Sequence, residues 1–387
     1  MSASSVPLPS CPWYRARQGL LRALALFAAV RLGGVVAMAV VNRLAHRPPL
    51  RSLAHSWDSE WYLHIATHGY GSLTRVAPGG AVQTDLAFFP LYPGLTRGVL
   101  TALPLTPGAA ALLVSWAAAV AAACGIHAIG RLLYGGGVAT VLVCLWAALP
   151  HSVVLGLAYT ESLLTALAAW SLYCVLRRRW LWAGVLAALA GLSRPTGLAV
   201  ALAVIAACAQ EVVSRRGRVR PGVWACAAIA PTGWTAYVVW AGARAGDPLR
   251  GYFRVQQAWD SRFDFGVRSA LFLKALFLHG GPVVYPLALA VVAAGVLLFC
   301  LLCAERAPLP LVVFAGALVV LVLGGSGAFS SKPRFLIPAF PLLIPWARAV
   351  VRAWPARRTQ ALLIGSALAS VSLLYGAYLT SVAHSPL

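Results

Sequence analysis

The sequence predicts an all-α polytopic membrane protein, and three observations support this fold class. Hydrophobic residues make up 60% of the 387 positions, charged residues only 10%, and the mean hydropathy is +0.80. Apolar runs of helix length recur from one end of the chain to the other. A helix of about 20 apolar residues spans a bilayer, and each unpaired backbone group in lipid costs several kcal/mol. We therefore expect a single integral membrane domain built from transmembrane helices.

About eleven transmembrane helices are predicted from the apolar runs. They are expected at residues 19–41, 109–129, 136–156, 157–176, 180–192, 197–213, 222–242, 280–303, 309–328, 335–352 and 361–381. No small-residue cleavage site follows the first apolar core, so this span is expected to be retained. Pro195 and Gly197 interrupt the run between residues 180 and 213, which favours a hairpin of two short helices that meet at the outer face.

Short arginine-rich loops orient these helices through the positive-inside rule. On the predicted cytoplasmic side the loops hold Arg15, Arg17, Arg22, Arg131, Arg177, Arg178, Arg179, Arg215, Arg216, Arg218, Arg220, Arg306, Arg352, Arg357 and Arg358. The N-terminus is then cytoplasmic, the C-terminus lies outside, and the protein is expected in the plasma membrane. Residues 42–108 and 243–279 become two long extracytoplasmic loops.

The net charge of +22 does not indicate a nucleic-acid-binding protein, because the arginines lie in short loops between apolar spans rather than on one soluble face. Arginine outnumbers lysine by 29 to 2, which is typical of GC-rich coding and favours a bacterial source. Seven of the eight cysteines lie in or beside apolar spans, so no disulfide framework is expected.

Acidic side chains are concentrated in the two long outer loops. These loops contain six of the nine acidic residues, namely Asp58, Glu60, Asp85, Asp247, Asp260 and Asp264. A transporter usually keeps its polar groups near the middle of the membrane, within broken helices. The uneven distribution therefore favours an enzyme that acts at the outer surface of the membrane.

The stretch HSWDSEWYLHIATHGY, residues 55–70, combines carboxylates with large aromatic rings. If it is helical, Asp58, Trp61 and Tyr62 share one face. A carboxylate near low-dielectric material has a high free-energy cost, so it is normally either ion-paired or required for function. Asp58 among Trp57, Trp61 and Tyr62 suits a general base that deprotonates a sugar hydroxyl while the rings hold the sugar. The alternative is an interfacial helix whose rings lie at the lipid headgroups.

Glu60, His64 and His68 lie at helical spacing on another face of the same stretch. This spacing permits a metal site, but the HExxH pattern is absent, so we expect a solvated polar face and predict no metal. The glycine-rich sequence YGGGVAT at residues 134–140 lacks the lysine of a phosphate-binding loop. A nucleotide sugar is therefore not expected as the donor, and no cofactor is predicted.

Three motifs in a fixed order resemble the PIG-V family, which includes the second mannosyltransferase of GPI-anchor assembly and its bacterial relatives. WDSEWYLHIATHGYG (57–71) followed by DLAFFPLYPGL (85–95) is similar to the first luminal loop of that family. LPHSVVLGLAYTESLLTAL (149–167) and GLSRPTGL (191–198) resemble two later segments. The resemblance covers roughly residues 50 to 200, and beyond them mainly the topology is similar.

The resemblance implies a GT-C glycosyltransferase with its active site in the first outer loop and a polyprenyl-phosphate sugar, here polyprenyl-phosphate-mannose, as donor. It makes Asp58 the expected catalytic base and Glu60 a secondary candidate. A bacterium makes no GPI anchor, so the acceptor is expected only to be a glycan, a lipid or a protein. Two alternatives stay open: a lipid-linked-sugar flippase or small-molecule transporter, and a GT-C enzyme that uses another lipid-linked sugar.

A departing phosphate requires positive charge at the site, because preorganised charge is usually the largest catalytic contribution. Arg194, Arg334 and Lys332 are the expected donor-phosphate ligands. Arginine can bind a phosphate through two parallel hydrogen bonds, and each of the two arginines lies beside a proline. The alternative for each cation is an interfacial anchor in contact with lipid headgroups.

Three further residues are expected to bind substrate. Glu161 lies near the outer end of a span, where a carboxylate is a candidate functional group. Its alternative role is a structural ion pair, for which Arg194 is the expected partner. In the second outer loop, Gln257 and Trp259 are expected to hydrogen-bond and stack on an acceptor sugar.

Overall fold

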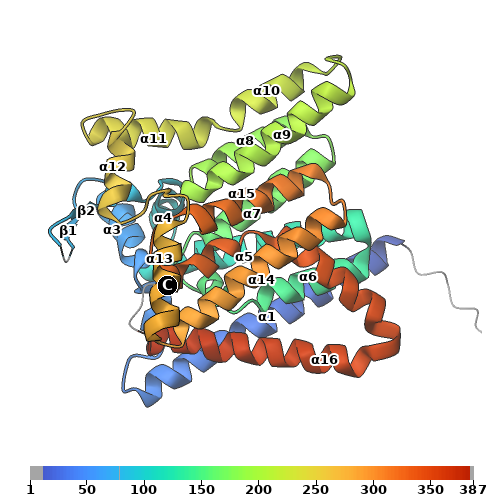
Figure 1. Cartoon of the computed structure of the whole chain (residues 1–387), viewed down its shortest axis with the longest axis horizontal. Coiled ribbons are helices and arrows are strands. Elements are labelled where there is room, and N and C mark those ends of the chain that lie inside the picture. The colour runs from blue at the N-terminus through green and yellow to red at the C-terminus, as the bar shows by residue number, and fades with distance from the viewer. Residues whose placement is uncertain (1–11, 78, 384–387) are drawn as a thin grey trace, which may run out of the picture.

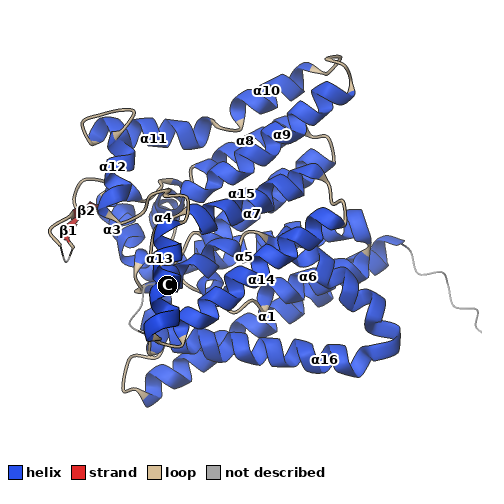
Figure 2. Ribbon diagram, viewed as in Figure 1, coloured by secondary structure: helices blue, strands red, loops and turns tan. Residues whose placement is uncertain are grey.

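The computed structural model describes residues 12–77 and 79–383. This part of the chain is almost entirely helical, and its one sheet is a two-stranded hairpin (Figure 2). The helices of the bundle lie side by side, and the segments between residues 51 and 102, together with α12 and α13, gather at one end of it, on the left of Figure 1. The all-α membrane fold predicted from the composition is therefore correct.

The bundle helices correspond to the predicted apolar spans. They are α1 (Pro12–Leu44), α5 (Pro107–Tyr134), α6 (Gly136–Ala147), α7 (Glu161–Leu176), α8 (Trp180–Gly191), α9 (Leu198–Ser214), α10 (Pro221–Ile229), α11 (Thr232–Arg244), α14 (Val284–Ala304), α15 (Leu309–Gly324) and α16 (Ile344–Ser381).

Six helical stretches in the described part of the chain are long and apolar enough to cross a membrane. They are Arg17–Leu44, Pro107–Tyr134, Pro195–Ser214, Pro221–Arg244, Val284–Ala304 and Phe340–Ser381. The apolar helices α6, α7, α8 and α15 are shorter. The count of eleven membrane crossings therefore stays a prediction.

Several helices end or bend at positions other than those predicted, and a proline lies at or near each of these positions. The helix predicted over 136–156 ends at Ala147, because Pro150 disfavours a continuing helix, and a 3₁₀ turn follows at Ser152–Gly156. The span predicted over 222–242 is broken at Pro231 into α10 and α11. The last two predicted spans form the two limbs of α16, which bends at Arg357, two residues after Pro355. The predicted hairpin is present, because a 3₁₀ turn at Pro195–Gly197 separates α8 from α9.

Residues 42–108 and 243–279, predicted to be extracytoplasmic and named here the first and second outer segments, hold short helices and one hairpin rather than open loops. The first contains α2 (Arg51–Ala54), α3 (Asp58–His68), β1 (Thr74–Val76), β2 (Val82–Thr84) and α4 (Leu91–Ala102), and the second contains α12 (Gly251–Ala258) and α13 (Val267–His279). The hairpin is antiparallel, with Thr74 opposite Thr84.

Arg31, in the middle of α1, holds the non-helical segment that follows α6. Its guanidinium donates to the carbonyl of Ala147 at 2.6 Å and also to that of Ser152. Free carbonyls at a helix C-terminus attract a cation. The buried Trp146 beside them donates to the carbonyl of Ile337 at 3.0 Å. These contacts fix the two irregular segments that carry Glu161 and Arg334 to the same end of the bundle.

Candidate active site

Asp58 is the first residue of α3, and the residue before it has an unusual backbone. Trp57 has a φ of 48°, a left-handed value that bulky side chains rarely adopt, and its side chain is 43% exposed. Such strain persists where the surrounding structure imposes it, and it is frequent at functional sites. A carboxylate in the first turn of a helix is stabilised by the helix dipole. Asp58 therefore lies at the start of a helix, with its side chain 28% exposed.

Four charged side chains, which we name the charged cluster, meet beside this helix. They are Asp58, Glu161, Arg194 and Arg334. The Asp58 Oδ2 and Arg334 Nη2 atoms are 2.8 Å apart, and the Glu161 Oε1 and Arg194 Nη1 atoms are 2.5 Å apart. The Arg334 Nε atom lies 3.9 Å from Glu161 Oε1 and links the two pairs. Two carboxylates and two guanidinium groups balance in charge.

The charged cluster is assembled from four distant parts of the sequence. Asp58 comes from α3, and Glu161 begins α7. Arg194 precedes the Pro195–Gly197 turn between α8 and α9, and Arg334 lies in the 3₁₀ segment Phe329–Leu336. Three of the four lie where a proline or a 3₁₀ turn interrupts the helical bundle. The same breaks that divide the predicted spans therefore present these side chains.

Most of the charged cluster is buried. The side chain of Glu161 is 2% exposed, that of Arg194 8% and that of Arg334 10%. Burial opposes the charged form of Arg334, but the carboxylates of Asp58 and Glu161 outweigh it and raise the pKa of this guanidinium above its usual value. Arg334 is therefore a fixed positive charge at every pH at which the protein is folded.

Both arginines lie against the same aromatic ring. The guanidinium carbon of Arg194 lies 5.1 Å from the ring centre of Phe335, and that of Arg334 lies 5.0 Å from it. Arg334 also lies 5.5 Å from the ring of Tyr159. Cations on aromatic faces gain most when water is excluded. Arg334 Nε and Nη1 are nonetheless buried without a hydrogen-bond partner among the described residues, which leaves donors for an anionic ligand.

The predicted aromatic residues of α3 differ in exposure. Trp61 and Tyr62 are buried, and Trp61 stacks on Phe88 with ring centres 5.5 Å apart. Trp259, from the second outer segment, packs edge-on against Trp61 at 4.9 Å. Trp61 and Tyr62 therefore form a packed wall behind Asp58. Trp57 is the predicted ring that remains exposed to a substrate.

The second outer segment docks on the segment between β2 and α4. All five carbonyls of residues 84–88 accept hydrogen bonds, four of them from side chains of other elements. Gln256 donates to Ala87 at 3.1 Å, Trp259 to Thr84 at 3.3 Å, and Tyr237 lies within hydrogen-bond distance of both Leu86 and Phe88. Gln256 makes this contact, whereas its neighbour Gln257, an expected substrate ligand, is exposed on α12.

Asp85 is a further buried acid that sequence reasoning did not assign. Its side chain is completely buried, and one carboxylate oxygen accepts from the backbone N–H of Gly71 at 2.8 Å. Gly71 has a φ of 85°, so this bond fixes a tight turn after α3. The signal for Asp85 was its place within the DLAFFP motif.

Glu60 and Lys332 are not brought to the charged cluster. Glu60 lies on the exposed face of α3, 3.1 Å from His55. Lys332 donates to Ser269 at 2.8 Å, to the Val322 carbonyl at 2.6 Å and to the Gly325 carbonyl at 2.7 Å. An ammonium has three protons, and all three are engaged at the C-terminal end of α15. Lys332 therefore ties that helix end to α13.

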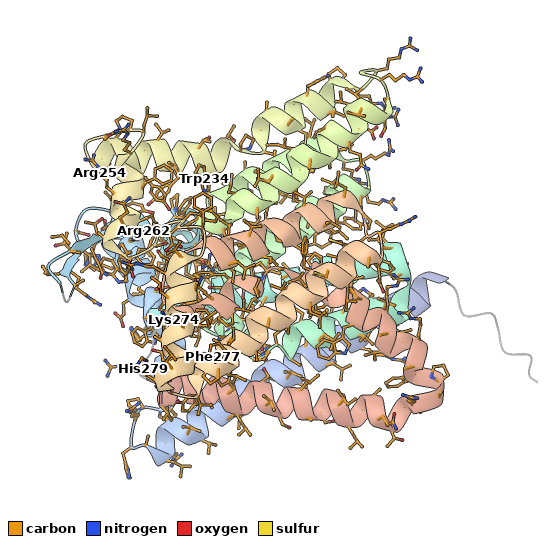
Figure 3. All side chains as sticks on the ribbon, in the orientation of Figure 1. Trp234, Arg254, Arg262, Lys274, Phe277 and His279 are labelled. Carbon is orange, nitrogen blue, oxygen red and sulfur yellow. The ribbon has the colours of Figure 1, made fainter. Side chains whose placement is uncertain are left out.

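The remaining polar candidates lie apart from the charged cluster. His64 and His68 stack at 4.5 Å on the outside of α3, and in the described part of the chain no three His, Cys, Asp or Glu residues are grouped for a metal ion. Arg254, labelled with Arg262 in Figure 3, is exposed on α12 and lies 3.8 Å from Asp247.

The arrangement of helices defines a class: the chain has the GT-C glycosyltransferase fold. ArnT from Cupriavidus metallidurans, in a crystal structure bound to undecaprenyl phosphate, aligns with a TM-score of 0.52 and 16% identity, over 92% of this chain and 75% of that one. The Archaeoglobus fulgidus oligosaccharyltransferase in complex with Zn and sulfate aligns with a TM-score of 0.51 and 15% identity, over 92% and 54%.

The chain spans about half the length of the archaeal oligosaccharyltransferase. No protein-family model matches the sequence, and no curated protein matches it significantly. At these identities the similarity defines the fold and leaves the residues of the charged cluster to be argued from their own geometry.

Proposed function

We propose that this protein is a mannosyltransferase of the PIG-V type, which transfers mannose from a polyprenyl-phosphate-mannose to a hydroxyl of a glycan, lipid or protein acceptor at the outer face of a bacterial plasma membrane. The observation that carries the proposal is the convergence of Asp58, Glu161, Arg194 and Arg334 at the end of the bundle where the outer segments gather. The GT-C fold and the undecaprenyl phosphate bound by ArnT support a lipid-linked donor. The motif resemblance supports mannose.

In the proposed reaction Asp58 acts as the general base. Its carboxylate accepts the proton of the acceptor hydroxyl while that oxygen attacks the anomeric carbon of the donor sugar. The bond from the anomeric carbon to the phosphate oxygen breaks, and the polyprenyl phosphate leaves with the electron pair. Attack from the opposite side inverts the β-linked donor to an α-linked product. The partial exposure of Asp58 supports this role, because a hydroxyl must reach its carboxylate.

Arg334 is proposed to hold the donor phosphate. Its charge is fixed by two carboxylates, and Nη1 has no hydrogen-bond partner among the described side chains. Arg194, whose guanidinium also lies on the ring of Phe335, is proposed to assist.

The test is Asp58→Asn in purified protein, with labelled polyprenyl-phosphate-mannose and a panel of acceptors. Loss of a general base lowers the rate by about 100-fold or more, so the variant is expected to retain under about 1% of the transfer activity. Glu60→Gln is the discriminating partner variant, because this carboxylate is exposed and paired with His55. It is expected to stay within about twofold of wild type.

Folding of both variants is checked by gel filtration and by thermal unfolding. If Asp58→Asn keeps more than about a tenth of the activity, Asp58 is not the base. If wild-type protein moves lipid-linked mannose across vesicle membranes without forming new glycosidic bonds, the protein is a flippase and the proposed transfer reaction is wrong.

A further inference from the structure

A large cavity with a basic lining lies at the other end of the bundle from the charged cluster. Its volume is about 680 Å³, and α1, α5 and α7 contribute its walls. The polar side chains that line it are Arg17, Arg131, Arg177 and His127. We name it the basic pocket. Glu161 and Arg177 mark opposite ends of α7, roughly 24 Å apart at 1.5 Å per residue, so the basic pocket is separate from the proposed active site.

The positive charge of the basic pocket is not neutralised by the protein. No acidic residue lines it, and none of its three arginines forms a salt bridge within the described chain. A ligand with several acceptor oxygens would bind these arginines through charge-assisted hydrogen bonds.

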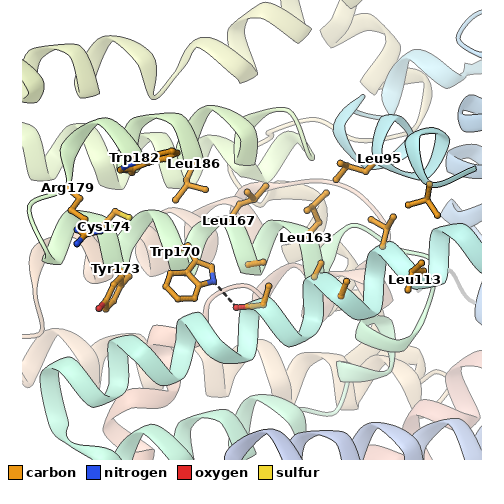
Figure 4. A pocket seen from close by; sticks show the side chains of 16 residues that line it. Leu95, Leu113, Leu163, Leu167, Trp170, Tyr173, Cys174, Arg179, Trp182 and Leu186 are labelled. Carbon is orange, nitrogen blue, oxygen red and sulfur yellow. Dashed lines mark hydrogen bonds between the residues drawn. The ribbon is translucent and has the colours of Figure 1, made fainter. Parts of the chain in front are cut away.

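An apolar groove of about 730 Å³ runs from the basic pocket toward the outer end of the bundle. Trp170 and Tyr173 line both cavities, so the groove and the basic pocket are adjacent. Figure 4 shows the groove extending from Arg179 and Tyr173 at one end to Leu95 and Leu113 at the other. Apart from the Arg179 end, its lining is almost entirely aliphatic and aromatic.

We infer that the basic pocket and the groove together form a binding site for an anionic lipid. Arginine binds phosphate oxygens with charge-assisted hydrogen bonds, and basic pockets between transmembrane helices on the cytoplasmic side bind anionic head groups. The phosphate lies among Arg17, Arg131 and Arg177, and one hydrocarbon chain lies in the groove. By the positive-inside prediction the head group is in the cytoplasmic leaflet. The site is independent of the proposed transferase reaction.

The adjacency of the two cavities favours a lipid over a free phosphate ion. A free ion would occupy only the basic pocket. A lipid would also place a hydrocarbon chain in the apolar groove, and the burial of that apolar surface would stabilise the complex. A phospholipid such as phosphatidylglycerol and a polyprenyl phosphate share this chemistry, because each joins an anionic phosphate to a long apolar chain. The experiment distinguishes these two sources.

The test is native mass spectrometry of the purified full-length protein with phosphatidylglycerol, phosphatidylcholine, a polyprenyl phosphate and inorganic phosphate as separate probes. The expected result is retention of an anionic lipid, and at least a tenfold weaker retention by the triple variant Arg17→Gln, Arg131→Gln, Arg177→Gln. The matched control replaces Arg22, Arg216 and Arg357, which lie on the same predicted side but do not line the basic pocket. It changes the net charge equally and is expected to retain the lipid.

A second pair of variants tests the groove. Ala117 lines it and is exposed, so Ala117→Trp fills it without disturbing the core. This variant is expected to weaken lipid retention by at least fivefold, whereas Leu297→Trp on α14, 61% exposed and outside the groove, is expected to leave it unchanged.

The retention of phosphatidylglycerol is compared with that of polyprenyl phosphate, and the more tightly retained probe identifies the lipid. Preference for phosphatidylglycerol or for polyprenyl phosphate supports the inference and identifies the ligand. Equal retention of phosphatidylcholine, or equal losses in the basic-pocket triple variant and its control, would overturn it. Binding of inorganic phosphate with no effect of Ala117→Trp would show an ion site and overturn the lipid assignment.

Discussion

At the scale of single residues, the charged cluster joins the expected general base and two of the expected phosphate ligands in one network of ion pairs. The sequence predicted a base, Asp58, and three phosphate ligands, Arg194, Arg334 and Lys332, of which Lys332 lies apart from the charged cluster. It also left open an ion pair between Glu161 and Arg194. The structure pairs Glu161 with Arg194 at 2.5 Å and Asp58 with Arg334 at 2.8 Å. The two arginines therefore have carboxylate partners that a donor phosphate must compete with or share.

Glu161→Gln is expected to destabilise the fold strongly. It leaves the buried Arg194 without its charged partner, and breaking a buried ion pair costs about 3–5 kcal/mol. The measurement is the free energy of unfolding in mixed micelles. Glu211→Gln is the control: Glu211 also contacts two arginines, Arg178 and Arg215, but these are more than half exposed, and such pairs contribute about 0–1 kcal/mol. Equal losses in both variants would contradict a buried role for Glu161.

Arg334→Lys tests whether donor binding depends on the positive charge of this side chain alone or also on the geometry of its guanidinium group. Lysine keeps a positive charge near Asp58 but lacks the guanidinium fork that holds a phosphate through two bonds. The KM for the lipid-linked donor is expected to rise by about tenfold, the equivalent of about 1.4 kcal/mol, while the KM for the acceptor stays within about twofold. Kinetics with each substrate varied in turn provide the measurement. An unchanged donor KM would remove Arg334 from the phosphate site.

At the scale of elements, the second outer segment supports the first. The carbonyls of residues 84–88 accept from Tyr237, Gln256 and Trp259, which fastens the segment before α4 to α11 and to the C-terminal part of α12. Tyr70, from the first outer segment itself, also donates to the carbonyl of Phe88. The backbone N–H of Leu91 also donates to the carbonyl of Leu192, two residues before Arg194, at 3.0 Å. These contacts connect α3, which carries Asp58, to the turn that carries Arg194.

Gln256→Ala and Gln257→Ala form a matched pair at this scale. Gln256 bonds the Ala87 carbonyl at 3.1 Å and the Tyr252 hydroxyl at 2.8 Å, whereas Gln257 is exposed. Leaving a buried acceptor without its donor costs about 1–3 kcal/mol. Amide hydrogen exchange in residues 84–92 is expected to accelerate at least fivefold in Gln256→Ala and to stay near wild type in Gln257→Ala. The reverse order would show that α12 does not support this segment.

The sequence predicted the apolar helices better than their ends. Hydropathy located the spans, but Pro150, Pro231 and Pro355 decide where helices stop or bend. Asp58, Arg194 and Arg334 could be recognised because charges beside helix breaks are rare in an apolar chain. Lys332 and Arg334 are two residues apart, and only the direction of each side chain in the 3₁₀ segment separates a helix anchor from a site residue. For the same reason α12 places Gln256, and not Gln257, against Ala87.

At the scale of the whole molecule, the bundle has two chemically different ends. One end carries α3, α12 and the charged cluster, and the other carries the arginines of the basic pocket. The outer ends of α1 and α16 meet on the first side, where Arg47 donates to the carbonyl of Ser381 at 2.5 Å. The positive-inside rule assigns the arginine-rich end to the cytoplasm.

This orientation predicts the labelling of single cysteines in a cysteine-free background. Cysteine introduced at Gln257 is expected to react with a membrane-impermeant maleimide added to intact cells, and cysteine at Arg216 only after the cells are opened, because both positions are exposed but at opposite ends. Gel-shift assays of the labelled protein provide the measurement. Labelling of the Arg216 position in intact cells would reverse the topology and place Asp58 inside the cell.

The docking of α12 on residues 84–88 limits which segments can be exchanged between proteins of this fold in a chimera. The carbonyls of Thr84, Leu86 and Ala87 are matched to Trp259, Tyr237 and Gln256, which lie outside the first outer segment. A chimera that receives only the first outer segment from a relative is expected to misplace its aspartate unless these three donors fit the new segment. We therefore expect the first outer segment, α11 and α12 to be exchangeable only together, as one module.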